Sequence, residues 1–479
     1  MTGGPPHPPW TTSTALVAGL ARSGFAAARA LRAVGAAVVA VDAATPAGSD
    51  TLRERAQGLT ALGVDVRLAD DGSDSLAGVD LVVASPGWPP SSPLLREAIA
   101  AGVPVWSEVE LALALRGADA ADWLVVTGTN GKTTTVRMLT AMLVAAGHRA
   151  IAAGNVGTPL VDVVTGERAL DVLAVELSSA QLHFTPSLHS VAAAVLNVAP
   201  DHLDWHRSYD DYVAAKAHIF DGATDARIFN ADDPAVRAMI TPGGHGRPVG
   251  FTLAAPEPGS LGIVDGMLVD RAFAGDRTVA LAAVSEVQPA APHNVANALA
   301  AAALARAYGV PAAAVRDGLR AYRPDPHRIA HVATIDGVAF VDDSKATNPH
   351  AAAASLAAFE HVVWIAGGLG KGADFDPLVA TSAPRLRAVI LLGRDRGAIR
   401  AALERHAPDV PVVEVVEPET KGMQDGAAVI ARAVAAAADL AHAGDTVLLA
   451  PACASWDMFS DYGARGDSFA AAVRARAAS

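Results

Sequence analysis

Short apolar runs, each ending in a glycine-rich or polar turn, recur along most of the chain. Residues 14–20 form such a run, and Gly19 and Gly24 bracket a turn into a helical pattern. Residues 36–41 form the next run, which ends at Asp42. Repetition of an apolar run, a turn and a helix predicts βα units that build a parallel sheet. Ligands of such folds bind at the carboxyl ends of the strands.

One of these turns has the composition of a phosphate cradle. Residues 124–127 lead into Gly128-Thr129-Asn130-Gly131-Lys132-Thr133-Thr134. Backbone N–H groups of a glycine-rich turn close around an anion, and a helix that starts at Lys132 adds its positive dipole end. Lys132 would reach the β- and γ-phosphates, and Thr133 would offer its hydroxyl to Mg²⁺. The usual loop has a glycine where this chain has Val126, so the turn is a shortened variant that still predicts binding of a nucleoside triphosphate.

Other apolar runs end in polar side chains. Residues 171–175 lead to Glu176, where a Mg²⁺ ligand near the phosphate loop would be needed. The alternative for a lone strand-end glutamate is a surface salt bridge. His202 follows another run, and Lys216 lies in a predicted helix over 212–220, where the alternative is a solvated position. Spacing alone assigns neither residue a role.

The third part of the chain repeats the theme of strand and turn. Four apolar runs there should place their turns on one edge of one sheet, and they cover residues 338–341, 362–366, 388–392 and 446–450. Gly-rich or polar turns follow all four, including the segments that hold Asp343, Lys371 and Ser455. The Pro-rich stretch 324–328 predicts a linker before this third part.

Composition narrows the class of protein. The 479 residues suggest about three domains at roughly 150 residues each, and we expect them at 12–115, 116–324 and 325–479. The net charge of −13 argues against nonspecific nucleic-acid binding. A single cysteine, Cys453, excludes an intramolecular disulfide. Without a long uncharged apolar stretch or a signal-peptide pattern, we expect a cytoplasmic protein with no membrane partner.

Five motifs occur in the order that they have in the Mur ligases, the ATP-dependent amino-acid ligases of peptidoglycan precursor synthesis. These are Gly128–Thr134, Gly154-Asn155-Val156-Gly157, Glu176–Leu182, Asn197 through Asp204, and His293–Asn297. The resemblance covers the chain from about Thr14 to its C-terminus. Asp343–Asn348 and Ser455–Phe459 are similar to the turns of the members of the family that add D-glutamate.

This resemblance implies an α/β fold of three domains, each with a mostly parallel sheet: a Rossmann-like N-terminal domain that binds the UDP substrate, a central P-loop ATPase domain, and a Rossmann-like C-terminal domain for the amino acid. The implied reaction joins D-glutamate to UDP-N-acetylmuramoyl-L-alanine through an acyl phosphate and releases ADP and phosphate. The implied cofactors are ATP and two Mg²⁺ ions, with Lys216 carbamylated, and the implied state is a monomer.

The family's site residues carry over onto matching positions. Catalytic roles are implied for Lys132, Glu176, His202, Lys216 and Lys371, and metal binding for Thr133, Glu176, His202 and Lys216. ATP contacts are implied for Gly128, Thr129, Asn130, Gly131, Lys132, Thr133, Thr134, Asn294, Asn297, Arg328 and Asp343. The UDP substrate is expected at Leu20, Ser23, Asp42, Ser85, Gly87, Asn155 and His202, and D-glutamate at Thr347, Lys371, Ser455 and Tyr462.

The chain departs from the family pattern at several turns. Ala21 and Arg22 alter the first turn, Ala43 and Ala44 offer no polar side chain after Asp42, and Leu369 stands where some members have an aspartate. Other hypotheses are a family ligase for another amino acid and an ATP-binding regulatory protein without catalysis. A nicotinamide dehydrogenase is disfavoured, because Ala21 replaces the middle glycine of the dinucleotide fingerprint.

Overall fold

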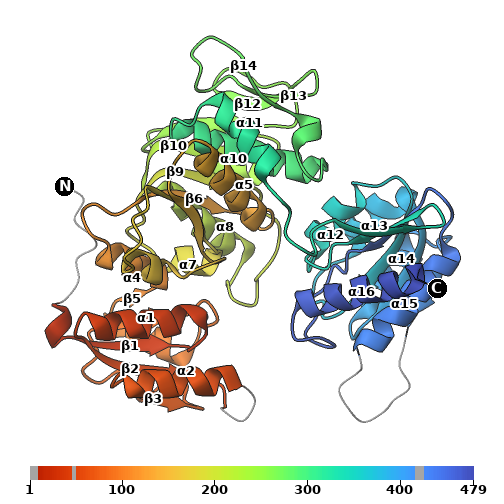
Figure 1. The fold of residues 1–479 in the computed structure, drawn as a ribbon. Coiled ribbons are helices and arrows are strands. Elements are labelled where there is room, and N and C mark those ends of the chain that lie inside the picture. The colour runs from red at the N-terminus through yellow and green to blue at the C-terminus, as the bar shows by residue number, and fades with distance from the viewer. Residues whose placement is uncertain (1–8, 46–49, 416–425, 479) are drawn as a thin grey trace. The chain divides into compact units, whose positions relative to one another are not determined.

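The computed structural model describes residues 9–45, 50–415 and 426–478, which include every candidate site residue. By its contacts the chain divides into two compact units, Met1–Val287 with Val295–Tyr322, and Gln288–Asn294 with Arg323–Ser479. The described residues form three sheets flanked by helices (Figure 1). The prediction of three mostly parallel α/β sheets is confirmed, while the domain boundaries at residues 12, 116 and 325 stay predictions.

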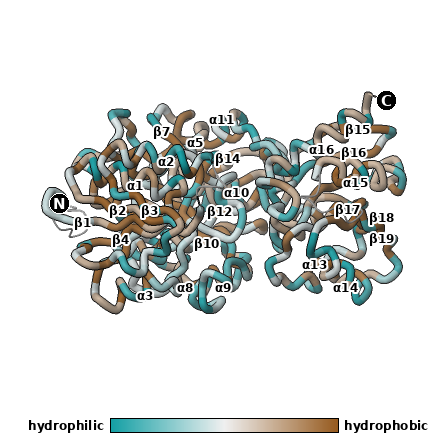
Figure 2. The backbone as a smooth tube through the Cα atoms, turned by 90° about the horizontal axis from the view of Figure 1, so that it is seen from below, coloured by the Kyte–Doolittle hydropathy of each residue, from teal (hydrophilic) through white to brown (hydrophobic). Residues whose placement is uncertain are grey.

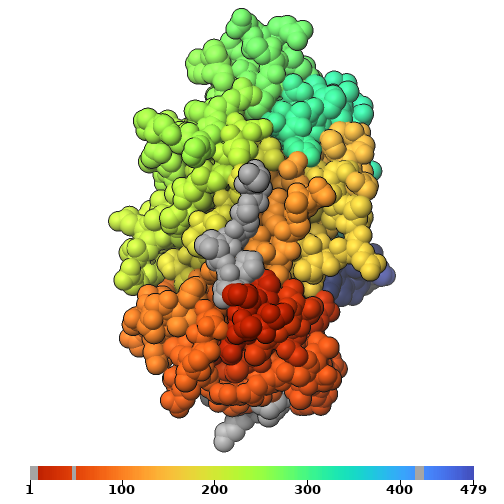
Figure 3. Space-filling view, turned by 90° about the vertical axis from the view of Figure 1, so that its left-hand side faces the viewer, coloured from red at the N-terminus to blue at the C-terminus, as the bar shows by residue number. Residues whose placement is uncertain are grey.

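The first sheet is fully parallel, with the strand order β3-β2-β1-β4-β5. Its strands are β1 (Thr14–Ala18), β2 (Ala37–Asp42), β3 (Asp65–Leu68), β4 (Leu81–Ala84) and β5 (Val105–Trp106). Short helix η1 (Trp10–Thr12) precedes them, and α1 (Arg22–Ala33), α2 (Asp50–Ala61) and α3 (Pro93–Ala100) connect them. The space-filling view shows this part, red to orange, as one packed body (Figure 3). The strand order changes direction at β1, so a ligand site is expected beside its end.

The second sheet has the order β14-β13-β12-β11-β10-β9-β6-β8-β7. Its strands are β6 (Asp122–Thr127), β7 (Ala150–Gly154), β8 (Val172–Glu176), β9 (Ser190–Val195), β10 (Ala223–Asn230), β11 (Arg247–Phe251), β12 (Ser260–Val264), β13 (Met267–Asp270) and β14 (Val279–Ala283). The helices around it are α4 (Glu108–Leu115), α5 (Lys132–Ala145), α6 (Leu160–Val164), α7 (Ser179–His183), α8 (Tyr209–Ala217), η3 (His218–Phe220), α9 (Pro234–Ala238), η4 (Val284–Glu286), α10 (Pro292–Ala307) and α11 (Ala312–Ala321). Strands β12 to β14 pair antiparallel, a feature that the sequence analysis missed.

The third sheet has the order β15-β16-β20-β17-β18-β19, in which only β15 among the described strands runs antiparallel to its neighbour. Its strands are β15 (Ala330–Ile335), β16 (Val338–Asp342), β17 (Val362–Gly367), β18 (Leu386–Leu392), β19 (Val412–Glu414) and β20 (Thr446–Leu449). They are covered by α12 (Pro349–Leu356), α13 (Asp376–Ser382), η5 (Ala383–Arg385), α14 (Arg396–His406), α15 (Gly426–Leu440) and α16 (Tyr462–Ala477). The four apolar runs predicted to share a sheet edge are therefore adjacent parallel strands.

Burial of the strands on both faces explains why their sequences are continuous apolar runs. A strand of a parallel sheet is covered on both faces, and all four residues of β4 and of β20 are buried. The tube is accordingly mostly hydrophobic around the labels β1, β2 and β17 (Figure 2). Alanine lets helices approach the sheets closely, and residues 298–305 of α10 are wholly buried. No helix in the described part of the chain is long and apolar enough to cross a membrane.

Helix α4 connects the first sheet to the second, and two buried carboxylates in its first turn hold it there. Glu108 Oε1 accepts the Val161 N–H at 2.7 Å, at the start of α6. Glu110 accepts both the N–H and the hydroxyl of Ser187. The Ser107 hydroxyl caps the helix by accepting the N–H groups of residues 109 and 110. Two glutamates on one short helix thus bind two separate segments of the central part.

Glu108 is the less completely hydrogen-bonded of the two buried carboxylates. It is 2% exposed, and its Oε2 has no hydrogen-bond partner in the described part of the chain. Burial raises the pKa of Glu108 to about 7. The hydrogen bond from the Val161 N–H lowers this pKa and so partly opposes the effect of burial. Folding therefore favours the protonated carboxyl, and this contribution to stability is present below the unfolded pKa and is lost as the pH rises to about 7.

We predict that Glu108→Gln removes one pH-dependent contribution to stability. Between pH 4.5 and 7.5 the wild-type free energy of unfolding should fall through this group by up to about 3 kcal/mol, since each pKa unit corresponds to about 1.4 kcal/mol. The variant cannot ionise at this position and should lack that fall. Urea titrations over this pH range measure the difference, and exposed Glu97→Gln serves as the control. Parallel curves for wild type and Glu108→Gln would contradict the assignment.

Candidate active site

The predicted phosphate loop connects β6 to α5. Gly131 has a φ of +84°, and a Cβ on it would overlap the side chain of Asn297, so glycine is required there. Lys132 begins α5 and donates from Nζ to the carbonyl oxygens of Gly128 at 2.8 Å and Thr129 at 2.9 Å. The lysine side chain therefore folds back over the turn that precedes it.

Residues after β9 fix the shape of this turn. Asn197 exchanges two hydrogen bonds with the backbone of Asn130, at 2.9 and 3.1 Å. The Thr129 hydroxyl lies 2.9 Å from the Tyr212 hydroxyl and accepts the Ala199 N–H at 3.0 Å. The sequence analysis assigned no role to Tyr212. Asn197 is the first residue of the family motif that ends at Asp204, and this motif was the sequence signal for its place beside the loop.

Glu176 ends β8 beside the phosphate loop and is 2% exposed. Its Oε2 accepts the Thr133 hydroxyl at 2.8 Å, and its Oε1 accepts the Asn155 amide at 2.8 Å. The surface salt bridge considered for this residue is therefore wrong. Carboxylate and hydroxyl oxygens beside a phosphate loop are the donors that Mg²⁺ prefers, so the residues present fit that ion. The described part of the chain has no group of three or more His, Cys, Asp or Glu side chains that could hold a metal by itself.

Lys216 is buried at 2% exposure within α8, so the solvated position considered for it is wrong as well. Its Nζ donates to the Gly128 carbonyl at 2.9 Å and lies 4.6 Å from the centre of the Tyr212 ring. Burial, and then the charge of Lys132, lower the pKa of Lys216 well below its ordinary value, although Asp201 and Glu176 oppose this. An amine in this position loses its proton far more readily than a surface lysine.

His202 lies in a different environment. Its side chain is exposed, its φ is +54°, and its backbone N–H donates to its neighbour Asp201. The next histidine, His206, is the buried one: its Nε2 lies 2.9 Å from the Ser179 hydroxyl. Burial lowers the pKa of His206 to about 4, so it packs as a neutral ring. The sequence analysis did not single out His206.

The turn after β1 brings three strand ends of the first sheet together. Asp42 accepts the N–H groups of Leu20 at 2.7 Å and Ala44 at 2.9 Å. The Ser85 hydroxyl donates to the Gly19 carbonyl, and a Cβ on Gly24 would overlap that same carbonyl. The carboxylate of Asp42 is therefore used to hold two turns, which gives it a structural role that the sequence did not reveal.

Two arginines reach this turn. Arg22, at the start of α1, donates to the Gly157 carbonyl at 2.8 Å, and Arg55 of α2 donates to the Leu20 carbonyl at 3.2 Å. Arg22 thus connects the first sheet to the segment that holds Asn155. The candidate residues Ser23 and Gly87 lie in α1 and in the turn after β4.

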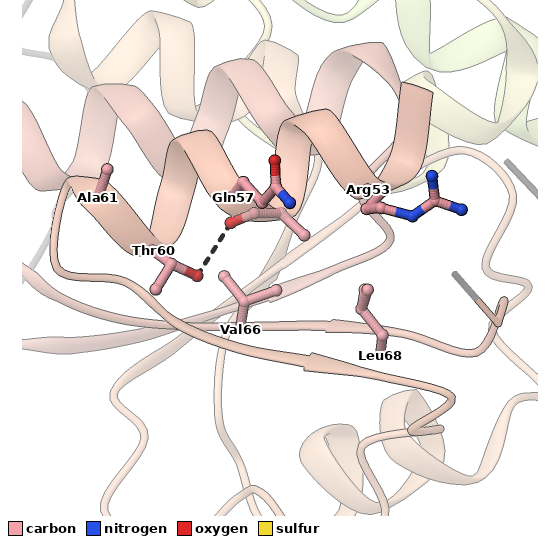
Figure 4. A pocket seen from close by; sticks show the side chains of 7 residues that line it. Arg53, Gln57, Thr60, Ala61, Val66 and Leu68 are labelled. Carbon is pink, nitrogen blue, oxygen red and sulfur yellow. Dashed lines mark hydrogen bonds between the residues drawn. The ribbon is translucent and has the colours of Figure 1, made fainter. Parts of the chain in front are cut away.

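A shallow depression elsewhere in this part contains none of the candidate residues. It lies between α2 and the edge strand β3, where Arg53, Gln57, Thr60 and Ala61 face Val66 and Leu68 (Figure 4). The Thr60 hydroxyl is already used, because it donates to the Ala56 carbonyl at 2.9 Å. The depression is therefore separate from the turn after β1.

In the second unit, the turn after β16 is held by buried polar groups. Asp343 accepts the Ser355 hydroxyl and the Ile329 N–H, and burial raises the pKa of Asp343 to about 6. Arg328 pairs with Asp325 at 3.7 Å. Asn294 belongs to this unit, whereas Asn297, one helical turn later in α10, belongs to the first.

The candidate D-glutamate residues follow neighbouring strands of the third sheet. Thr347 lies after β16, Lys371 after β17, Ser455 after β20, and Tyr462 starts α16. The buried Arg465 donates to the hydroxyl and carbonyl of Ser344 and to the carbonyl of Cys453, and so connects two of these turns. A single arginine within a helical pattern gave no signal of this role in the sequence.

Family models match three consecutive stretches of the chain. The "Mur ligase MurD-like, N-terminal domain" matches residues 13–107, the "Mur ligase middle domain" residues 126–305, and the "Mur ligase, glutamate ligase domain" residues 327–453. Their order is that of the three sheets.

Curated relatives match nearly the whole chain. A UDP-N-acetylmuramoylalanine--D-glutamate ligase of Streptomyces avermitilis is 58% identical over 97% of this chain and 98% of its own length. Those of Thermobifida fusca and Mycobacterium avium are 57% and 49% identical, each over 96% of this chain and over 98% and 96% of their own lengths.

Solved structures share the fold at low identity. A pseudomurein peptide ligase type C from Methanothermus fervidus superposes with a TM-score of 0.59 at 17% identity, over 97% of this chain and 100% of its own. A MurF ligase from Thermotoga maritima in complex with ADP gives 0.56 at 17% identity, over 98% and 99%. By its sequence matches along almost its full length, this chain belongs to the Mur ligase family.

Proposed function

We propose that this protein is an ADP-forming ligase that joins D-glutamate to UDP-N-acetylmuramoyl-L-alanine in peptidoglycan precursor synthesis. The relatives named for this reaction align end to end with the chain. The observation that carries the proposal is the phosphate loop with Lys132 folded over it and Thr133 hydrogen-bonded to Glu176. This arrangement supports the proposal, because a lysine and two oxygen donors lie at the loop to which we assign ATP phosphates and Mg²⁺.

The reaction begins with the carboxylate of the L-alanyl group, which is a poor acyl donor. Its oxygen attacks the γ-phosphorus of ATP, the bond to the bridging oxygen breaks, and ADP leaves. Lys132 and the N–H groups of the loop offset the charge on the phosphates, and this positioning is the main contribution that a protein makes to phosphoryl transfer. The amine of D-glutamate, as the free base, then attacks the acyl phosphate, and phosphate leaves from the tetrahedral intermediate. We assign stabilisation of this intermediate to Lys371 and His202.

The metal ligands that we propose are Thr133, Glu176, His202 and a modified Lys216. Mg²⁺ retains waters and takes phosphate oxygens, so two protein oxygens suffice at the first ion. Bound Mg²⁺ supplies charge neutralisation and orients the phosphates. Thr133 and Glu176 are already in contact, whereas His202 is exposed in this structure.

We propose carbamylation of Lys216 for the second ion. A neutral amine adds to CO₂, forming an N–C bond and releasing one proton, and the product is an anion with two oxygen donors. The lowered pKa of Lys216 supports this reaction, since only the unprotonated amine is nucleophilic. Its contact with the Gly128 carbonyl places the amine beside the phosphate loop.

The remaining assignments rest on the family and on the turns described above. We propose that the UDP substrate contacts Leu20, Ser23, Asp42, Ser85, Gly87, Asn155 and His202. We propose that ATP contacts Asn294, Asn297, Arg328 and Asp343 in addition to the phosphate loop. D-glutamate is assigned to Thr347, Lys371, Ser455 and Tyr462. The cytoplasmic location and the monomeric state stay predictions.

The experiment that tests the function is phosphate release from ATP in the presence of UDP-N-acetylmuramoyl-L-alanine. D-glutamate should drive release, and L-glutamate, L-alanine and a diamino acid should not. Release that depends on another amino acid would assign the chain to a different ligase of the family. Absence of release with every amino acid would contradict a ligase function.

We predict that Lys132→Ala lowers turnover by about 10²-fold or more while the fold stays intact, because a fixed cation beside the phosphates is lost. MgATP should raise the thermal midpoint of the wild type and leave that of the variant unchanged. Arg137→Ala, on the exposed face of the same helix, is the matched control and should behave as wild type. Normal turnover in a folded Lys132→Ala protein would overturn the assignment.

We predict that Lys216→Ala loses most activity and that acetate, a small carboxylate, partly restores it. Wild-type protein incubated with ¹³C-bicarbonate should show a carbamate signal in ¹³C NMR that the variant lacks. Asp210→Ala, an exposed position on the same helix, controls for damage to α8. Full activity of Lys216→Ala, or no carbamate signal from the active wild type, would exclude the carbamate.

A further inference from the structure

Trp456 is an exposed aromatic side chain that the reaction as described does not use. It is 64% exposed, in the turn after β20, among residues that are otherwise mostly buried. The Nζ of Lys371 lies 4.3 Å from the centre of the Trp456 ring. Such a contact between an ammonium and an indole face is a cation–π interaction, and tryptophan provides the strongest of these among the aromatic residues.

The two turns that carry this pair are connected through their backbones. Leu369 and Ala454 exchange hydrogen bonds of 2.9 and 3.0 Å, which places the turn after β17 against the turn after β20. Lys371 itself has a φ of +52°, a constrained conformation for a residue with a side chain. The backbone under the lysine and the tryptophan is therefore fixed, and the remaining freedom is that of the long lysine side chain.

Nearby acids do not neutralise the lysine. Asp395 accepts the Gly370 N–H at 2.8 Å, and Asp457 accepts the Arg394 N–H at 2.9 Å, so both carboxylates hold the turns themselves. Within the part of the chain that the structure describes, Lys371 forms no ion pair. Leu369, which stands where some family members have an aspartate, also leaves the charge uncompensated. An anion that enters this edge of the sheet would therefore meet the Lys371 ammonium without displacing a carboxylate from it.

A second lysine at the same sheet edge is held in a similar way. The Nζ of Lys345 lies 4.0 Å from the centre of the Tyr462 ring, at the start of α16. Both aromatic rings come from the segment 455–462, and both lysines follow strands that neighbour β20. Two lysines of this sheet edge therefore lie against aromatic rings.

We propose that Trp456 is a positioning residue that holds the Lys371 ammonium for a carboxylate of the incoming amino acid, and so contributes to selection of a dicarboxylic substrate. The proposal rests on the assignment of Lys371 to the D-glutamate site. The ring restricts the lysine rotamers and replaces part of the water around the ammonium without cancelling its charge. The lysine side chain then loses less conformational entropy when the carboxylate binds.

The first test is a graded series at position 456. Trp456→Phe keeps a weaker aromatic face, and Trp456→Leu keeps bulk without one. The KM for D-glutamate should rise in the order Trp, Phe, Leu, by about two- to fivefold at the end, as expected for an exposed cation–π contact. The KM for ATP should stay close to wild type, and kcat should change less than the KM for D-glutamate. Phe273→Leu, which removes the ring under Arg247 at 4.1 Å in the central part, is the matched control.

The second test is spectroscopic. Titration of D-glutamate into protein with UDP-N-acetylmuramoyl-L-alanine and a non-hydrolysable ATP analogue should give a saturable change in tryptophan fluorescence. L-glutamate should give none, and Trp456→Phe should lose the change. A change of wild-type size in Trp456→Phe would assign the signal to another tryptophan and overturn the proposal.

A double variant separates this proposal from the assignment on which it rests. If Trp456 acts through Lys371, adding Trp456→Leu to Lys371→Met should raise the KM for D-glutamate no further. A wild-type KM in Trp456→Leu, or an undiminished effect in the Lys371→Met background, would overturn the role of Trp456 alone. A wild-type KM in Lys371→Met would instead remove Lys371 from the D-glutamate site.

Discussion

The candidate active site depends on the parallel pairing of β6 with β8 on one side and β9 on the other. The register sets Val126 opposite Glu176 and Thr127 opposite Val195, so three chain segments leave the sheet side by side. The phosphate loop follows β6, Glu176 ends β8, and Asn197 follows β9. Glu176 then accepts the hydroxyl of Thr133 at the start of α5, and Asn197 hydrogen-bonds Asn130 of the loop. A slip of β6 against β8 would separate Thr133 from Glu176, and a slip of β6 against β9 would separate the loop from Asn197.

The sequence predicted those parts of the site that depend on local pattern. The glycine-rich turn before Lys132 and the acid after β8 are visible because strand, turn and helix follow one another in the chain. Burial was not visible in the same way. Lys216 reads as a solvated helix position, and only the packing of α8 against the phosphate loop shows that its amine is enclosed. Glu108 and Arg465 were missed for the same reason, because their partners are distant in sequence. The antiparallel strands β12 to β14 were missed because their apolar runs are short.

Buried ionisable groups are concentrated where chain segments meet, and each responds to burial according to its charge. Glu108 and Asp343 have raised pKa values, and Lys216 and Arg465 have lowered ones, the last to about 10. Burial disfavours the charged form in every case. The hydrogen bonds of these groups reach backbone atoms of separate turns, so each cost in desolvation is offset by a contact that fixes two segments together. For Lys216 the same lowering of the pKa also supports the carbamylation that we propose.

The division of the chain into two units determines which fragments of the protein can be expected to fold by themselves. The first unit resumes at Val295 after its interruption, and α11 packs against α5 so closely that a side chain on Gly318 would overlap the backbone of Met142. Helix α5 is the one that starts with Lys132. A fragment that stopped at residue 287 would therefore expose the apolar face of the helix that carries the phosphate loop. Independent folding of the first two sheets requires the chain to continue through Tyr322. The unit that folds together is therefore not one uninterrupted stretch of the sequence.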